Sequence, residues 1–200
     1  MPKVKYGLKN VYYAMATIAV NGSATYATPK KLPGAVSMSV DPAGEQITFY
    51  ADDIAYFVSG GNTGYTGTLE LALITDDFRK DALSEDNSET GVLIEKADGV
   101  SKPFALIFEF TTDDKAQKYV LYNCIASRPN VSGNTKAETT EVSTETINIT
   151  ASSIYNAVLD ANIVKAKADE TASAYATWTS AVWQPTTSPS PNPNPNPDED

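Results

Sequence analysis

Residues 102–129, with the sequence KPFALIFEFTTDDKAQKYVLYNCIASRP, have the pattern of a long antiparallel hairpin. In the first half, large apolar residues occupy every second position, which is the two-residue period of a strand with one apolar face. Residues 111–115 form a polar break that suits a turn, and residues 118–125 alternate again. Pro103 and Pro129 bracket the hairpin, because proline cannot donate to a sheet ladder. We therefore expect this hairpin to be the centre of a mainly β protein.

The composition limits the chemistry that the chain can perform. It has 200 residues, a formal net charge of −10, no histidine and one cysteine, Cys124. The length predicts one domain, or one domain plus an appendage, with a sizeable core. Histidine-based triads, proton shuttles and metal sites are excluded, as is an internal disulfide. The sequence contains no run of about 18 apolar residues, so it predicts no membrane-spanning helix. The N-terminus loosely resembles a signal peptide, but its apolar run alternates as a strand does, so we expect an intracellular product.

The charge is distributed unevenly along the chain. Five lysines precede the first acidic residue, Asp41, so the remainder carries a formal charge of −15. An acidic body disfavours tight binding to nucleic acid, which depends on neutralising phosphates. Residues 1–10 are predicted to form an extended arm containing Lys3, Lys5 and Lys9. A basic arm either docks on the acidic body of another copy or is a solvated terminus, and the composition favours neither.

Residues 36–64 are predicted to form a hairpin followed by a loop. Residues 36–40 alternate as a half-buried strand, residues 41–44 suit a turn, and residues 47–50 provide the second strand. Residues 51–64 contain two aspartates and several glycines around a short apolar run. We expect a long, partly structured loop there, and long loops in compact domains are usually functional or flexible.

Two helices are expected. Thr75 can cap a short helix near residues 76–83, with two aspartates in its first turn and Phe78 and Ala82 on its buried side. Residues 169–182 carry small and aromatic residues at helical spacing, and Pro185 follows them. We expect an amphipathic helix that packs on the sheet there.

The remaining segments are less regular. Residues 138–150 favour a strand, on which Glu141, Ser143 and Glu145 share a face that would contact water or a polar channel. Residues 186–200, TTSPSPNPNPNPDED, contain no core-forming side chains, so they are predicted to be disordered or a spacer.

We expect no catalytic site, no cofactor and no metal. Cys124 lies mid-strand without an activating histidine, so it is interpreted as a small buried hydrophobe. The adjacent pairs Asp76/Asp77 and Asp113/Asp114 suit a helix cap and a turn better than a hydrolytic site. The aromatic residues could stack on sugars, but their spread along the chain fits core and subunit contacts better; they include Tyr12, Tyr13, Tyr50, Tyr56, Tyr65, Trp178 and Trp183.

Several ordered blocks resemble the phi-thirteen-type major tail protein family, the tail tube subunits of long, non-contractile-tailed phages (siphophages) and prophages of Gram-positive bacteria. The blocks are GYTGTLELALITDDFRKDAL (64–83), KPFALIFEF (102–110), YVLYNCIASRP (119–129) and ETTEVSTETINITA (138–151). GLKNVYYA (7–14) and YATWTSAVW (175–183) also fit. The resemblance covers roughly residues 1–185, which we interpret as one tail tube domain, and it leaves the variable stretch 152–161 and the Pro/Asn-rich residues 186–200 outside.

The resemblance implies a mainly β fold, a two-sheet, barrel-like β-sandwich with a flanking C-terminal helix. It implies a structural subunit without enzymatic activity, which assembles in the host bacterial cytoplasm into the tail tube of the virion. Six copies form a ring, strands of the six join into an inner barrel, and stacked rings conduct double-stranded DNA during ejection. The expected partners are further copies, the tape measure protein, and the tail terminator and distal tail proteins.

Candidate site residues follow from combining the resemblance with the patterns above. Contacts between rings are predicted for Lys3, Lys5 and Lys9 of the arm and for Asp52, Asp53, Tyr56 and Phe57 of the 51–64 loop. Glu141 and Glu145 are predicted to face the lumen. The main alternative is a secreted β-sandwich adhesin or carbohydrate-binding module whose proline-rich tail is a linker. A small hydrolase with paired carboxylates is a second alternative.

Overall fold

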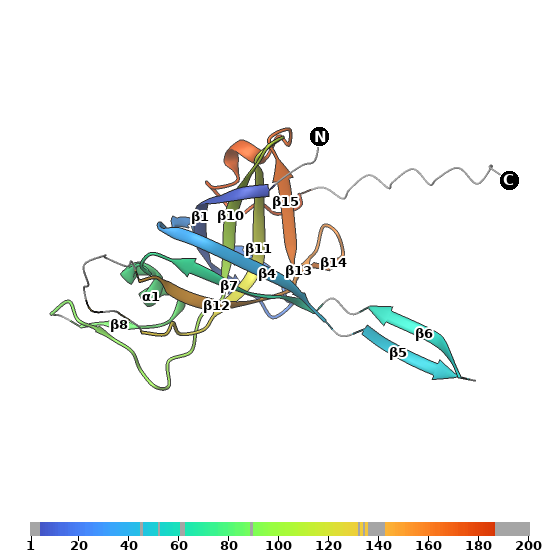
Figure 1. The fold of residues 1–200 in the computed structure, drawn as a ribbon, viewed down its shortest axis with the longest axis horizontal. Coiled ribbons are helices and arrows are strands. Elements are labelled where there is room, and N and C mark those ends of the chain that lie inside the picture. Colours follow the sequence, from blue (N-terminus) through green and yellow to red (C-terminus); the bar gives the residue numbers. More distant parts are fainter. Residues whose placement is uncertain are drawn as a thin grey trace.

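A computed structural model describes residues 5–44, 46–51, 53–60, 63–88, 90–131, 133, 135 and 143–186. This part of the chain is mainly β, with one nine-stranded antiparallel sheet, small two-stranded sheets and one short α-helix (Figure 1). The large sheet contains β1 (Lys5–Ile18), β2 (Ala24–Tyr26), β3 (Lys30–Lys31), β4 (Ala35–Ala43), β7 (Gly64–Leu71), β10 (Phe104–Thr112), β11 (Gln117–Ala126), β12 (Glu145–Ser152) and β15 (Lys165–Asp169). The small sheets are β5 (Gln46–Ala51) with β6 (Ile54–Gly60), β8 (Asp86–Asn87) with β9 (Leu93–Ile94), and β13 (Ile154–Asn156) with β14 (Ala161–Ile163).

The predicted central hairpin is confirmed as β10 and β11, in the middle of the strand order β2-β1-β10-β11-β12-β7-β4. Phe108 lies opposite Tyr119, and their rings stack with centroids 5.3 Å apart. Phe104 and Leu106 are fully buried on one face of β10, and Ala105 and Ile107 are fully buried on the other. The hairpin is therefore covered on both faces.

A one-residue bulge in β11 changes which side chains share a face. Leu106 lies opposite Leu121, but Phe104 lies opposite Cys124 rather than residue 123, so β11 contains one extra residue. Cys124 consequently packs in the same core cluster as Leu121, whereas Tyr122 packs in a second cluster on the other face. The sequence pattern placed Cys124 and Tyr122 on one face, which is wrong because the alternation does not reveal the bulge.

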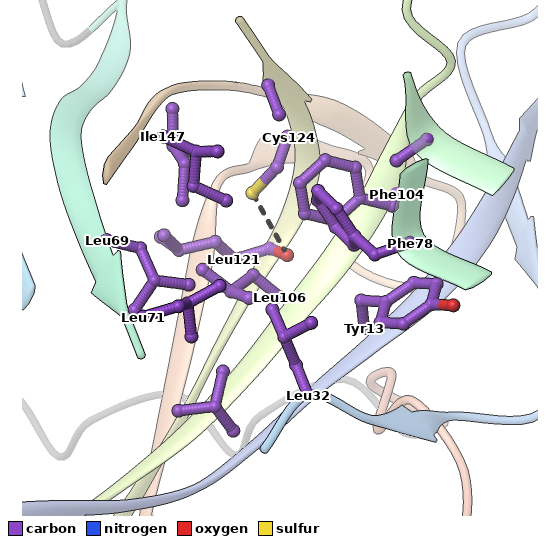
Figure 2. Close-up of a cluster of buried hydrophobic side chains, with 14 of the residues drawn as sticks. Tyr13, Leu32, Leu69, Leu71, Phe78, Phe104, Leu106, Leu121, Cys124 and Ile147 are labelled. Carbon is purple, nitrogen blue, oxygen red and sulfur yellow. Dashed lines mark hydrogen bonds between the residues drawn. The ribbon is translucent and has the colours of Figure 1, made fainter. Parts of the chain in front are cut away.

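The large sheet folds over onto itself at this bulge. Before it, residues 117–121 of β11 pair with β15, and after it residues 123–126 pair with β12. β12, β7 and β4 then run across β10 and β11 (Figure 1). The core lies between the two halves: Leu69 and Ile147 from one half meet Leu106 and Leu121 from the other (Figure 2). Nine of the described strands thus form one folded sheet, and the described residues contain neither the two large separate sheets of the expected sandwich nor a closed barrel.

The short helix predicted near residues 76–83 is confirmed as α1 (Asp76–Ala82). The Thr75 hydroxyl accepts from the Phe78 amide at 3.4 Å and caps the helix. The Phe78 ring is fully buried and makes edge-to-face contacts with Tyr13 and Phe104, at centroid distances of 5.0 and 5.3 Å. α1 therefore closes one end of the core.

The amphipathic helix predicted over residues 169–182 is wrong. The segment forms turns and one 3₁₀ turn, η1 (Tyr175–Thr177). Local hydrogen bonds compete with a helix here, since the Asp169 carboxylate accepts from the Thr171 amide. The segment still packs on the sheet: Trp178 is buried against the second core cluster and stacks on Trp183, with centroids 5.5 Å apart.

Three other predicted segments differ from the structure. Residues 5–10, expected to belong to an arm, are the first part of β1 and pair with β10. The turn predicted at 41–44 is absent, because β4 continues through Pro42 to Ala43 and pairs with β7. Proline is tolerated in β4 because this strand lies at the edge of the sheet. The loop predicted over 51–64 is mostly a hairpin of β5 and β6, which turns at Asp53 with φ 61°. Residues 1–4 and 187–200, with the predicted disordered tail, lie outside the described residues.

Two buried charges connect the C-terminal segment to the sheet. Glu109 is 5% exposed and Lys118 is 8% exposed, and they lie opposite each other on β10 and β11. Lys118 Nζ donates to the Tyr175 carbonyl at 2.9 Å and lies 4.0 Å from the Tyr175 ring centroid. Burial by itself would raise the pKa of Glu109, but hydrogen bonds from Asn10 and Lys9 and the charges of Lys9 and Lys118 lower it overall.

We expect Gly67→Ala to destabilise the fold by about 3 kcal/mol. A Cβ at position 67 would lie 2.0 Å from the Ser39 carbonyl oxygen and 2.9 Å from Val40 Cα, so β4 would have to move away from β7. Thermal unfolding followed by circular dichroism measures the effect. Thr68→Ala, at an exposed position in the same strand, is the matched control. Equal melting temperatures for the two variants would show that β4 moves freely.

We expect Glu109→Gln to lower the free energy of unfolding at pH 7 by about 3 kcal/mol, because Lys9 loses its ion-pair partner and the buried Lys118 loses the nearby negative charge. The lowered pKa of Glu109 also predicts a pH dependence. Its stabilisation is fully present above its ordinary pKa of about 4.3 and is lost as the pH falls through the lower folded-state value. Urea unfolding between pH 3 and 7 should show a smaller pH dependence in the variant. Glu95→Gln is the exposed control, and parallel curves for Glu109→Gln and wild type would contradict the account.

Candidate functional site

The outward face of β4, β7 and β12 carries short polar side chains in a regular grid. Alternation places Leu69, Leu71 and Ile147 in the core and their neighbours on the opposite face. The grid has three cross-strand rows: Ser37, Glu70 and Thr146; Ser39, Thr68 and Asn148; and Asp41, Thr66 and Thr150. We call these nine residues the polar face.

The polar face is neutral to acidic and contains no lysine or arginine. Glu70 accepts from the Ser37 and Thr144 hydroxyls at 2.6 Å each, and these two hydrogen bonds lower the pKa of its carboxyl group. Glu70 is therefore ionised at neutral pH. Such a surface offers hydroxyls, one amide and two carboxylates, so it has no cation with which to bind phosphate groups.

β4 is an open edge beside the polar face. Within the described residues it pairs with β7 and with no other strand. An unpaired edge presents N–H and C=O groups that can pair with a strand of another chain. Pro42 removes one of these donors near the end of β4. The edge of β4 can thus accept a further strand.

The β5–β6 hairpin projects from the end of β4 and β7, beyond the body of the protein (Figure 1). Three of its large side chains are exposed: Tyr50 at 66%, Ile54 at 62% and Tyr56 at 73%. Asp53, at the turn beside Ile54, is also exposed. Apolar side chains left uncovered on a projecting hairpin are typical of a contact with another molecule.

The structure describes only some of the residues that were predicted to form contacts between rings. Lys3 and Asp52 lie outside the described residues, and the side chains of Lys5 in β1 and Phe57 in β6 are not described. Asp53 and Tyr56 are brought together on the projecting hairpin. Lys9 lies elsewhere, on β1, where its ammonium group is 3.2 Å from the Glu109 carboxylate. A role of these residues between rings stays a prediction.

The face of β12 that carries Glu145 is the core face, since Ile147 and Ile149 on the same face are buried. The Glu145 carboxylate accepts from the Ile74 amide at 2.7 Å and from Arg79 at 2.8 Å. It therefore fixes the segment that leads into α1, and these contacts give no support to a lumen-facing role. Glu141, the other predicted lumen residue, lies outside the described residues.

Sequence reasoning missed the polar face. Its signal is the alternation of threonine with glycine and leucine in TGTLEL (66–71) and of threonine and asparagine with isoleucine in TINIT (146–150). Both patterns show strands with one wet face. They do not show that the wet faces of three strands are adjacent, because that depends on the strand order.

Within the described residues, the cysteine is buried and the acidic residues form no cluster of potential metal ligands. The Cys124 thiol is fully buried, and burial raises its pKa. No group of three or more potential metal ligands occurs among the residues that the structure describes. Within the same residues, no helix has the length and apolar character needed to span a membrane.

We expect Glu145→Gln to lower the free energy of unfolding by about 1–3 kcal/mol, because Arg79 loses a charged partner. Urea unfolding measures the loss. Glu95→Gln is again the matched control, since its ion pair with Arg128 is largely exposed. An unchanged stability in Glu145→Gln would show that the carboxylate is not needed for the fold.

The chain was also compared with known proteins. No family model matches the sequence, and no curated protein matches it either.

Proposed function

We propose that the protein is the tube subunit of a long, non-contractile phage tail, in which hexameric rings stack into a conduit for DNA ejection. The sequence blocks described above suggest this function, and the polar face is the structural observation that best supports it. Accordingly the chain acts as a structural protein of the virion rather than as an enzyme. Its partners are further copies, the tape measure protein and the proteins at the two ends of the tube.

The polar face suits the wall of a channel through which DNA moves. Lysine and arginine bind DNA by neutralising phosphates, so a wall containing them would slow the passage. The polar face has none, and Asp41 and Glu70 repel phosphate weakly. Its hydroxyl and amide side chains are short, which leaves the lumen wide. In this proposal the polar face takes the place of Glu141 and Glu145 as the lumen lining.

In this proposal, copies assemble into a ring through the open edge of β4. Pairing of β4 with a strand of the adjacent copy would extend the polar face from subunit to subunit around the channel. The β5–β6 hairpin would contact a neighbouring copy through Tyr50, Ile54 and Tyr56. This contact joins two different surfaces, and such heterologous contacts can propagate into a ring or a stack.

We expect purified protein to form rings or tubes visible by negative-stain electron microscopy. In tubes of Thr68→Arg, a cryo-electron microscopy map should show six added side chains per ring inside the lumen, and the tubes should retain double-stranded DNA that wild-type tubes release. Thr177→Arg, at an exposed position on η1, is the matched control and should not retain DNA. A lasting monomer that binds glycan would favour a carbohydrate-binding module, and tubes with position 68 on the outer surface would exclude the polar face as the lining.

A further inference from the structure

An apolar cavity of about 120 Å³ opens between the two halves of the folded sheet. Met38 and Val40 of β4 line one side, and Phe108 and Leu121 of the central hairpin line the other. A cavity of about 150 Å³ with apolar walls can hold benzene. The cavity in this protein is therefore large enough for one branched aliphatic side chain.

A cation lies at the edge of this cavity. Lys165, the first residue of β15, is exposed, and its ammonium group lies 4.3 Å from the centroid of the Tyr65 ring, which also lines the cavity. Among the described residues, no carboxylate forms an ion pair with Lys165. The site thus combines an apolar hole with a positive charge beside it. It fits a ligand that carries an aliphatic group next to an anion.

The turn of the β5–β6 hairpin has this chemistry. Ile54 is 62% exposed, and Asp53 directly precedes it. Asp53 adopts φ 61°, which makes a tight turn, and the preceding position holds a further aspartate, Asp52. An aliphatic side chain and a carboxylate are therefore presented together at the end of a hairpin that projects from the body (Figure 1).

We propose that Ile54 of one copy inserts into the cavity of a second copy, with Asp53 paired to Lys165. The inference rests on the proposed function only in taking a second copy of the chain as the partner. The apolar walls bury Ile54, while the charge pair fixes the direction of the hairpin. The two surfaces differ, so each copy can receive one hairpin and present another.

A second exposed apolar group is the alternative receptor. Val92, Ile94 and Val100 are exposed on the segment around β8 and β9, at the opposite end of the molecule from the hairpin (Figure 1). That segment is acidic, and its Lys96 is already paired with Asp86. Docking there would bring Asp53 close to like charges such as Asp98, which disfavours the contact. The cavity has the complementary charge.

Cysteine cross-linking between two differently tagged full-length chains tests the docking. One chain carries Ile54→Cys and the other Met38→Cys, with a short bis-maleimide as the probe; Cys124 is fully buried and does not compete. We expect a cross-linked band that contains both tags. Ile54→Cys paired with Val92→Cys is the matched control and should give no such band. A band with Val92→Cys but not with Met38→Cys would overturn the proposal, as would the absence of both bands. Melting temperatures near that of the wild type verify that each variant folds.

A charge exchange tests the pairing independently. Asp53→Lys and Lys165→Glu should each reduce the cross-linking yield about tenfold, and the two together should restore it. Lys102→Glu, at an exposed position outside the cavity, is the control. Equal yields in all variants would overturn the ion pair.

Microscopy of the same samples separates this inference from the proposed function. Cross-linked copies that form neither rings nor tubes would sustain the docking and reject the tube. Tubes whose copies cross-link only through Val92→Cys would sustain the tube and reject the docking.

Discussion

The extra residue in β11 is the constraint on which the rest of the structure depends. The Tyr122 amide donates to the Val164 carbonyl beside β15, at 3.1 Å, and Asn123 is the first residue that pairs with β12. A bulge bends a strand and increases its twist, and strands that change partners in this way form the corners of folded sheets. Without it, β12, β7 and β4 would continue the sheet outward. Their apolar faces would then lack the opposite half of the core.

The same bulge determines which side chains each half of the sheet buries. It places Leu121 and Cys124 together in the core that Leu69, Leu71 and Ile147 complete. It leaves Tyr122 on the other face, where the C-terminal segment covers it through Trp178. Both faces of the central hairpin are therefore buried, each by different parts of the chain. One face is covered by the other half of the sheet and by α1, and the other is covered by the C-terminal segment together with Ala24 and Ile154.

The sequence predicted the features that depend on local patterns. The central hairpin followed from strict alternation, and α1 followed from a cap, two acids and a buried pair of residues. Features that depend on contacts between distant parts of the chain were missed. A bulge interrupts the alternation of a strand without producing a recognisable pattern in the sequence. The face of β11 on which Cys124 lies was therefore predicted wrongly, although its burial was predicted correctly. Helical spacing at residues 169–182 reflected packing of Ala172, Tyr175 and Val182 on the sheet, because turns can present apolar side chains at similar intervals.

The two faces of β12 show the same limit of prediction from sequence. Both faces of β12 carry polar residues, and sequence alone favoured the face with glutamates as the one lining a channel. Burial of Ile147 and Ile149 turns the face that contains Glu145 toward the core, so the lumen-facing role predicted for Glu145 gains no support from the structure. The small hydroxyl and amide side chains of the polar face are thus the ones left on the outward face. In the proposed tube, this face without cations would let DNA slide, whereas Glu145 on the inner face binds Arg79 of the helix that closes the core.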